Sequence, residues 1–163
     1  MERTKTIDFV ATKSNKDFVN PCNKICLIVD TIFKENFVRS CDVSSILYEP
    51  ECLPFKQFIQ NAFGKYNPSK DMIGHIIALL DKIVSTTNYV IKQNNINRIL
   101  IGLLSIITKY YRINKFLDKM FEISINDISN IENEVNVLIG NNASVDNIII
   151  KDYSDIIYKE INI

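Results

Sequence analysis

The stretch from Asn95 to Tyr110, NINRILIGLLSIITKY, contains the longest apolar run of the chain, Ile99 to Ile107, which Ser105 interrupts. Its apolar side chains fall on nearly every side of an α-helix: Ile96, Ile99, Leu100, Leu103, Leu104, Ile106 and Ile107. A helix that is apolar all round is buried, and this run reaches only about half of the ~20 residues that a membrane span needs. We therefore expect a helix over 95–111 at the centre of a helical domain, and no membrane segment.

The segments around this stretch carry apolar residues at helical spacing. The spacing predicts helices over 21–39, 54–66, 68–86 and 113–121, another from about 125 to 139, and one or two more within 144–163. Asn67 and Pro68 form a typical helix start, Ser124 begins a stretch resembling a capping box, and Gly140 follows that helix as a C-terminal glycine would. No long stretch alternates with period two, so we expect an all-α domain of about seven helices.

Composition argues against several classes of function. The chain has 163 residues and 19 basic against 19 acidic side chains, so its formal net charge is zero. Sequence-independent binding to nucleic acid requires a cationic surface, and we expect no nucleic-acid partner. The four glycines are too widely separated to form the glycine-rich loops that cradle phosphates.

The four cysteines and the single histidine do not form a metal site. Cys22 and Cys26 lie one helical turn apart, no pair has the C-x-x-C spacing, and Cys41 and Cys52 stand alone. We expect Cys22 and Cys26 to be buried thiols of an intracellular protein of the nucleus or cytoplasm, without a signal peptide, metal or cofactor. His75 lies in a strongly apolar segment, which favours a hydrogen-bonded core or helix-surface histidine over a catalytic one. No nucleophile or carboxylate pair indicates catalysis, so we do not expect an enzyme.

Four short motifs occur in an order that resembles the cyclin box. They are LLDKI at 79–83, NINRIL at 95–100, IITKY at 106–110 and ISINDISNIENE at 123–134. The chain is most similar to the P- or U-type cyclins, the single-box family typified by the fungal phosphate-pathway cyclin. Ordered matches cover residues 46–140, about three-fifths of the chain.

The resemblance implies a five-helix cyclin box that binds and activates a cyclin-dependent kinase. In that family a lysine ending the third box helix pairs with a glutamate of the fifth, and the pair anchors the C-helix of the kinase. The matching positions are Lys109 and Glu132. Ile106 and Tyr110 then become candidates for the floor and rim of the docking groove, and Asp81 and Arg98 match two further positions with an expected structural role.

The expected organisation has four parts. Residues 1–20 form a flexible N-terminus, 21–45 a helix and connector, 46–140 the cyclin box, and 141–163 a C-terminal helical extension. We expect a monomer before kinase binding. The first box helix lacks the substrate-docking face of cell-cycle cyclins, and the chain has no tryptophan. A helical interaction scaffold without a kinase partner shares the same pattern and remains the alternative; a two-repeat transcription factor of this fold would need a longer and more basic chain.

Overall fold

The computed structural model describes residues 21–159, and within them the chain forms seven α-helices and no strand. The helices are α2 (Pro21–Glu35), α3 (Phe55–Tyr66), α4 (Lys70–Thr86), α5 (Gln93–Tyr110), α6 (Leu117–Phe121), α7 (Ile125–Leu138) and α8 (Asn147–Tyr158). The all-α prediction is confirmed. The expected flexible segment 1–20 lies outside the described residues.

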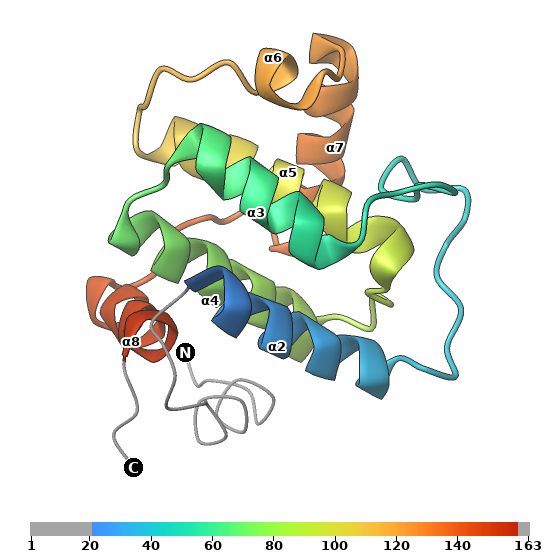
Figure 1. Ribbon diagram of the computed structural model, residues 1–163, viewed down its shortest axis with the longest axis horizontal. Coiled ribbons are helices and arrows are strands. Elements are labelled where there is room, and N and C mark those ends of the chain that lie inside the picture. Colours follow the sequence, from blue (N-terminus) through green and yellow to red (C-terminus); the bar gives the residue numbers. More distant parts are fainter. Residues whose placement is uncertain (1–20, 160–163) are drawn as a thin grey trace.

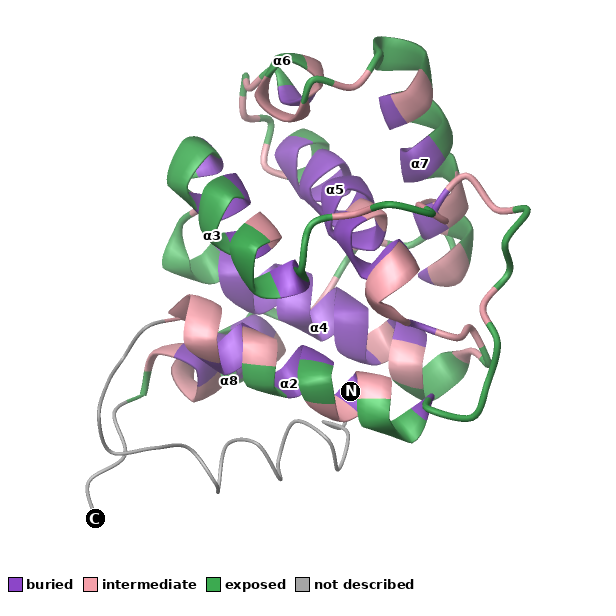
Figure 2. Ribbon diagram, turned by 45° about the vertical axis from the view of Figure 1, so that its right-hand side comes forward, coloured by how far each residue is buried: buried purple, intermediate pink, exposed green. Residues whose placement is uncertain are grey.

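Helix α5 is the most deeply buried element, as its apolar pattern predicts. It packs against α3, α4 and α7, while α4 packs along α8 and α2 covers α3 and α8. Figure 2 shows α4 and α5 almost entirely in the colour of buried residues, whereas the outer turns of α2, α3 and α7 are exposed. Figure 1 shows α6 and the start of α7 at the top of the view, above α3 and α5. The core therefore surrounds two apolar helices, and amphipathic helices close it from outside.

The start of α4 and the end of α2 differ from the sequence prediction. Asn67 ends α3 in the left-handed conformation, with φ 53°, and its N–H donates to the Phe63 carbonyl, so it does not start the next helix. Ser69 caps α4 instead, its hydroxyl accepting from the Met72 N–H. Helix α2 ends at Glu35 rather than near residue 39. Asparagine suits both a helix start and a left-handed helix end, and the sequence alone does not separate these two uses.

The expected helix over 113–121 is shorter than predicted, because α5 ends in a tight reversal. Arg112 adopts φ 55°, its N–H bonds to the Lys109 carbonyl, and the Ile113 N–H bonds to the Thr108 carbonyl. This pair of bonds is a Schellman motif. The chain then runs as a loop until α6 begins at Leu117.

Both predicted ends of α7 are confirmed. The Ser124 hydroxyl accepts from the Asp127 N–H at 3.1 Å. Beyond the helix, Gly140 has φ 71°, and the Asn141 N–H bonds to the Asn136 carbonyl at 2.7 Å. A left-handed residue after a helix favours glycine, because a Cβ there meets the following carbonyl oxygen.

Substituting Gly140 by alanine is expected to lower the free energy of unfolding by about 1 kcal/mol, because alanine is strained at positive φ. Gly64 is the matched control: it lies inside α3, and a Cβ there would meet no atom within 4 Å. Gly64→Ala is expected to stabilise the protein by about 0.5–1 kcal/mol, since glycine is a poor helix residue. Urea denaturation measures both changes, and a stabilised Gly140→Ala variant would contradict this assignment of the turn.

The expected core histidine is confirmed. His75 is fully buried in α4; its Nε2–H donates to the Ala143 carbonyl at 2.6 Å, and its Nδ1 accepts from the Tyr111 hydroxyl at 2.9 Å. The carbonyl can only accept, which fixes the neutral tautomer. His75 thus joins α4 to the end of α5 and to the loop before α8.

Burial lowers the pKa of His75 from its ordinary 6.5, an effect that the bond to Ala143 partly opposes. The unfolded chain therefore takes up this proton more readily than the folded chain. The stability that depends on neutral His75 is present above pH 6.5 and is lost as pH falls toward the lower folded-state pKa, by at most about 1.4 kcal/mol per pH unit. Denaturation from pH 7.5 to 5 should show a smaller loss for His75→Gln than for the unaltered chain, and equal losses would contradict this.

Candidate functional site

Lys109 and Glu132, which the cyclin resemblance pairs, lie in contact. Lys109 is in the last turn of α5 and Glu132 is in the middle of α7. The distance from Lys109 Nζ to Glu132 Oε2 is 2.8 Å. The two side chains differ in exposure, 70% for Lys109 and 11% for Glu132. The ammonium group therefore projects into solvent, while the carboxylate lies between the helices.

Ser105 is a third member of this cluster, and the sequence reasoning missed it. It lies one turn before Lys109 on α5 and is 5% exposed. Its hydroxyl donates to Glu132 Oε1 at 2.5 Å. The signal in the sequence was the single hydroxyl that interrupts the apolar run, four residues before Lys109. Such a residue is equally compatible with a bond to the carbonyl of the preceding turn, so only the packing of α7 identifies its partner.

Close packing of α5 against α7 brings the cluster together. A Cβ built at Gly102 would lie 2.4 Å from Val135 Cγ2 and 3.3 Å from Ile131 Cγ2. Only a residue without a side chain permits this approach. Glu132 lies on α7 between Ile131 and Val135, so the contact at Gly102 sets the distance over which Glu132 reaches α5.

A hollow of about 310 Å³ opens beside Lys109, between the end of α5, the loop 111–116, α6 and the first turns of α7. We call it the α5–α7 groove. Its lining consists of Ser105, Thr108, Lys109, Ile113, Lys115, Phe116, Leu117, Asp118, Ile125 and Ile128. Phe116 and Ile125 are 57% and 70% exposed. The groove therefore combines apolar walls with the Lys109 cation in its lining.

The loop that forms one wall of the groove is attached to the end of α3. Lys115 donates from its ammonium to the Tyr66 carbonyl, and its Nζ lies 4.3 Å from the centroid of the Tyr66 ring. The Tyr66 hydroxyl bonds to Thr108 Oγ1 at 2.6 Å. These contacts attach the loop to the end of α3, and they engage the charge of Lys115 within the protein.

Ile106 and Tyr110, the other two predicted kinase contacts, do not line the α5–α7 groove. Ile106 is 6% exposed and belongs to the core. Tyr110 is 45% exposed, and its ring packs edge-on against His75 with centroids 4.8 Å apart. Successive residues turn by about 100° around a helix, so Tyr110 lies on the neighbouring face of α5. The structure thus brings Lys109 and Glu132 together but places Ile106 and Tyr110 outside their groove.

Asp81 and Arg98 each connect a helix to another part of the fold. Asp81 is buried in α4 and accepts a hydrogen bond from the Tyr153 hydroxyl of α8. Arg98 donates to the Ile46 carbonyl at 2.7 Å, and its Nε lies 3.8 Å from the Glu49 carboxylate. Burial raises the pKa of Glu49, and the Arg98 charge offsets part of that rise.

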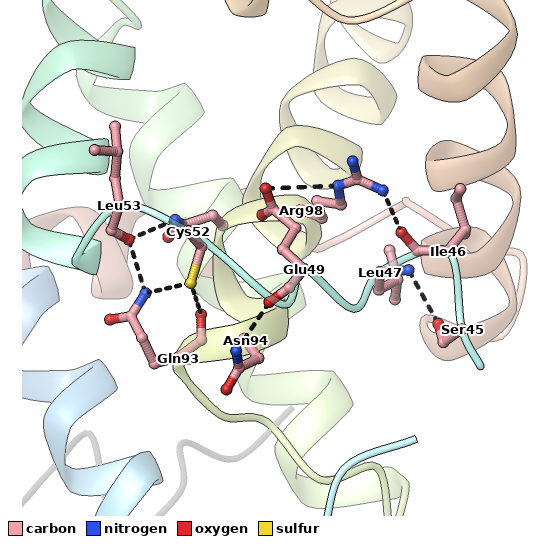
Figure 3. A network of polar contacts seen from close by, with 10 residues as sticks. Ser45, Ile46, Leu47, Glu49, Cys52, Leu53, Gln93, Asn94 and Arg98 are labelled. Atoms are coloured by element: carbon pink, nitrogen blue, oxygen red, sulfur yellow. Dashed lines mark hydrogen bonds and ion pairs between the residues drawn. The ribbon is translucent and has the colours of Figure 1, made fainter. Parts of the chain in front are cut away.

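The connector before α3 is fastened to the start of α5 by the network in Figure 3. Gln93 accepts from the Phe55 N–H at 2.9 Å and donates to the Leu53 carbonyl at 2.9 Å. Asn94 donates to the Glu49 carbonyl, also at 2.9 Å. Together with the contacts of Arg98, these bonds make the connector an ordered part of the same domain. The sequence pattern predicted this connector only as a link between helices.

Within residues 21–159, no group of three or more His, Cys, Asp or Glu side chains could hold a metal ion. No helix of that part of the chain is long and apolar enough to cross a membrane. Comparison with protein-family models, with curated proteins and with solved structures finds no match. Any functional conclusion therefore rests on the geometry of the site and on the residues that resemble the cyclin box.

Proposed function

We propose that this protein is a cyclin-like regulatory subunit that binds and activates a cyclin-dependent protein kinase, inside the cell, with no chemistry of its own. The observation that supports this most is the Lys109–Glu132 pair, at 2.8 Å, beside the α5–α7 groove. The resemblance assigns those two positions to the kinase contact from the sequence alone. The same two side chains lie together at an open, apolar groove, which is what a docking site for a helix requires.

The groove has the two properties that docking a helix needs. Its apolar walls, with Phe116 and Ile125 at the rim, supply area that binding would remove from water. Lys109, in the lining, supplies a charged contact that fixes the position of the docked helix along the groove. The charged contact and the apolar walls together fix which residues of the docked helix lie opposite Lys109.

Activation would follow as a shift of population in the kinase. A kinase C-helix moves between an inward position, which completes the Lys–Glu ion pair of the kinase active site, and an outward one. A subunit that binds only the inward arrangement favours it by the difference between its two affinities. The chain acts as a monomer that becomes half of a complex, and it needs no cofactor for this.

The proposal is tested by recovering the chain, tagged, from its native cell and assaying the recovered material for a protein kinase. The expected result is a kinase of the cyclin-dependent class in a one-to-one complex, whose phosphotransfer rate rises when purified chain is added to the isolated kinase. A complex that contains other proteins and no kinase would favour the helical scaffold instead. A kinase that binds without any change in rate would contradict activation.

A further inference from the structure

The carboxylate of Glu132 is committed to contacts within the protein. Its Oε2 accepts from Lys109 at 2.8 Å and its Oε1 accepts from the Ser105 hydroxyl at 2.5 Å. Glu132 is buried, and so is Ser105. Both carboxylate oxygens therefore have a donor on α5, and the group has little surface left for a third molecule.

Lys109 has the opposite character. Its side chain is 70% exposed, and an ammonium group carries three N–H donors and no acceptor. One donor is directed to Glu132, which leaves the others free to face the α5–α7 groove. At this position the groove therefore offers hydrogen-bond donors, whereas a pair of two accessible charges would offer both a donor and an acceptor.

We infer that Ser105 is a positioning residue that holds Glu132 away from the docking surface, so that a partner in the α5–α7 groove contacts Lys109 and must place an acceptor oxygen there. This inference rests on the proposed function, and it changes the role of Glu132. Glu132 orients and neutralises Lys109 from its buried position between α5 and α7, and it does not touch the partner.

The other charged groups of the groove are consistent with this arrangement. Lys115 is engaged by the Tyr66 carbonyl and ring. Among the lining residues the carboxylate is that of Asp118, which belongs to α6, whereas Lys109 and Glu132 belong to α5 and α7. Without the bond to Ser105, Glu132 could rotate toward the groove, where its charge would repel an acceptor that approaches Lys109.

A proton NMR experiment on the free chain tests the Ser105–Glu132 bond. A buried hydroxyl that donates to a carboxylate exchanges slowly with water, so we expect a resolved hydroxyl signal that disappears in Ser105→Ala. In Glu132→Gln the same signal should move upfield, because a neutral amide is a weaker acceptor than a carboxylate. Absence of a protected hydroxyl signal, or a signal that ignores Glu132→Gln, would overturn the inference whatever the partner is.

A double-mutant cycle with the purified kinase tests whether Glu132 acts only through Lys109. We expect Lys109→Met to weaken binding by at least about 30-fold and Glu132→Gln by about 3–10-fold. Glu132→Gln added to Lys109→Met should change the affinity by less than about twofold, because its effect depends on the lysine. Lys151→Met, on the exposed face of α8, is the matched control and should leave the full effect of Glu132→Gln in place.

The outcomes separate this inference from the proposed function. If Glu132→Gln weakens binding equally with and without Lys109, Glu132 contacts the partner directly and the inference fails while the kinase function stands. If the chain binds no kinase, the proposed function fails, and the hydroxyl signal still decides whether Ser105 holds Glu132 away from the groove. Ser105→Ala should also weaken kinase binding severalfold, and this loss should vanish in the Glu132→Gln background.

Discussion

Replacing Lys109 by alanine is expected to weaken kinase association by about 2–5 kcal/mol, the range for truncating one member of a charge pair that binding buries. Lys109 lines the α5–α7 groove, and its ammonium is bonded to Glu132 at 2.8 Å. Truncation removes the donors that face the partner, and it also leaves the Glu132 carboxylate with Ser105 as its remaining donor in this cluster. Titration of the purified kinase, followed by calorimetry, measures the change.

Glu132→Ala is also expected to weaken kinase association by about 2–5 kcal/mol, but for a different reason. It leaves Lys109 without the contact that orients it. Lys151→Ala is the matched control, since Lys151 is an exposed lysine of α8, a helix that does not line the groove. Undiminished kinase binding by both Lys109→Ala and Glu132→Ala would show that this pair is not part of the kinase-binding site.

Replacing Gly102 by alanine is expected to lower the free energy of unfolding by about 2–3 kcal/mol, the upper part of the range for overpacking a core. The new Cβ would lie 2.4 Å from Val135 Cγ2 and 2.9 Å from Val135 Cβ, both in the fully buried contact of α5 with α7. Relief requires the two helices to move apart. Such a movement also separates Lys109 from Glu132, so kinase binding should weaken together with stability.

A second substitution shows whether Val135 is the cause. Val135→Ala removes both γ-methyl groups of the crowded side chain, and the new methyl at position 102 then fills part of the space they leave. We expect the double variant Gly102→Ala/Val135→Ala to be at least about 1 kcal/mol more stable than the sum of the two single effects predicts. Additive effects in urea denaturation would show that the contact at Gly102 is not what limits the approach of α5 to α7.

Apolar periodicity predicted most of the fold because the central helix is an extreme case. A run such as 99–107 has no polar side to turn toward water, so it requires a helical core around it, and α5 occupies that position. Local chemistry also predicted both ends of α7: Ser124 accepts from the third residue of the helix, and Gly140 takes up positive φ. Each of these signals depends on neighbours in sequence.

The features that the sequence did not reveal depend on residues far apart in the chain. Asn67 suits either end of a helix, and in the structure it ends α3 while Ser69 caps α4. Ser105 has a defined role only because Glu132, 27 residues later, lies against it. The groove forms where the Schellman turn at Arg112 directs the loop away from α5. The predicted role of Lys109 and Glu132 came from family resemblance, which no pattern of spacing could replace.

The most direct test of the central claim is site-specific photo-cross-linking from the rim of the groove. A photoreactive residue in place of Ile125, which is 70% exposed on α7, should cross-link to the C-helix of the bound kinase. The same residue in place of Ile148, 73% exposed on α8, serves as the matched position away from the groove. We predict a kinase adduct from position 125 and none from position 148; an adduct from position 148 alone would contradict docking in the α5–α7 groove.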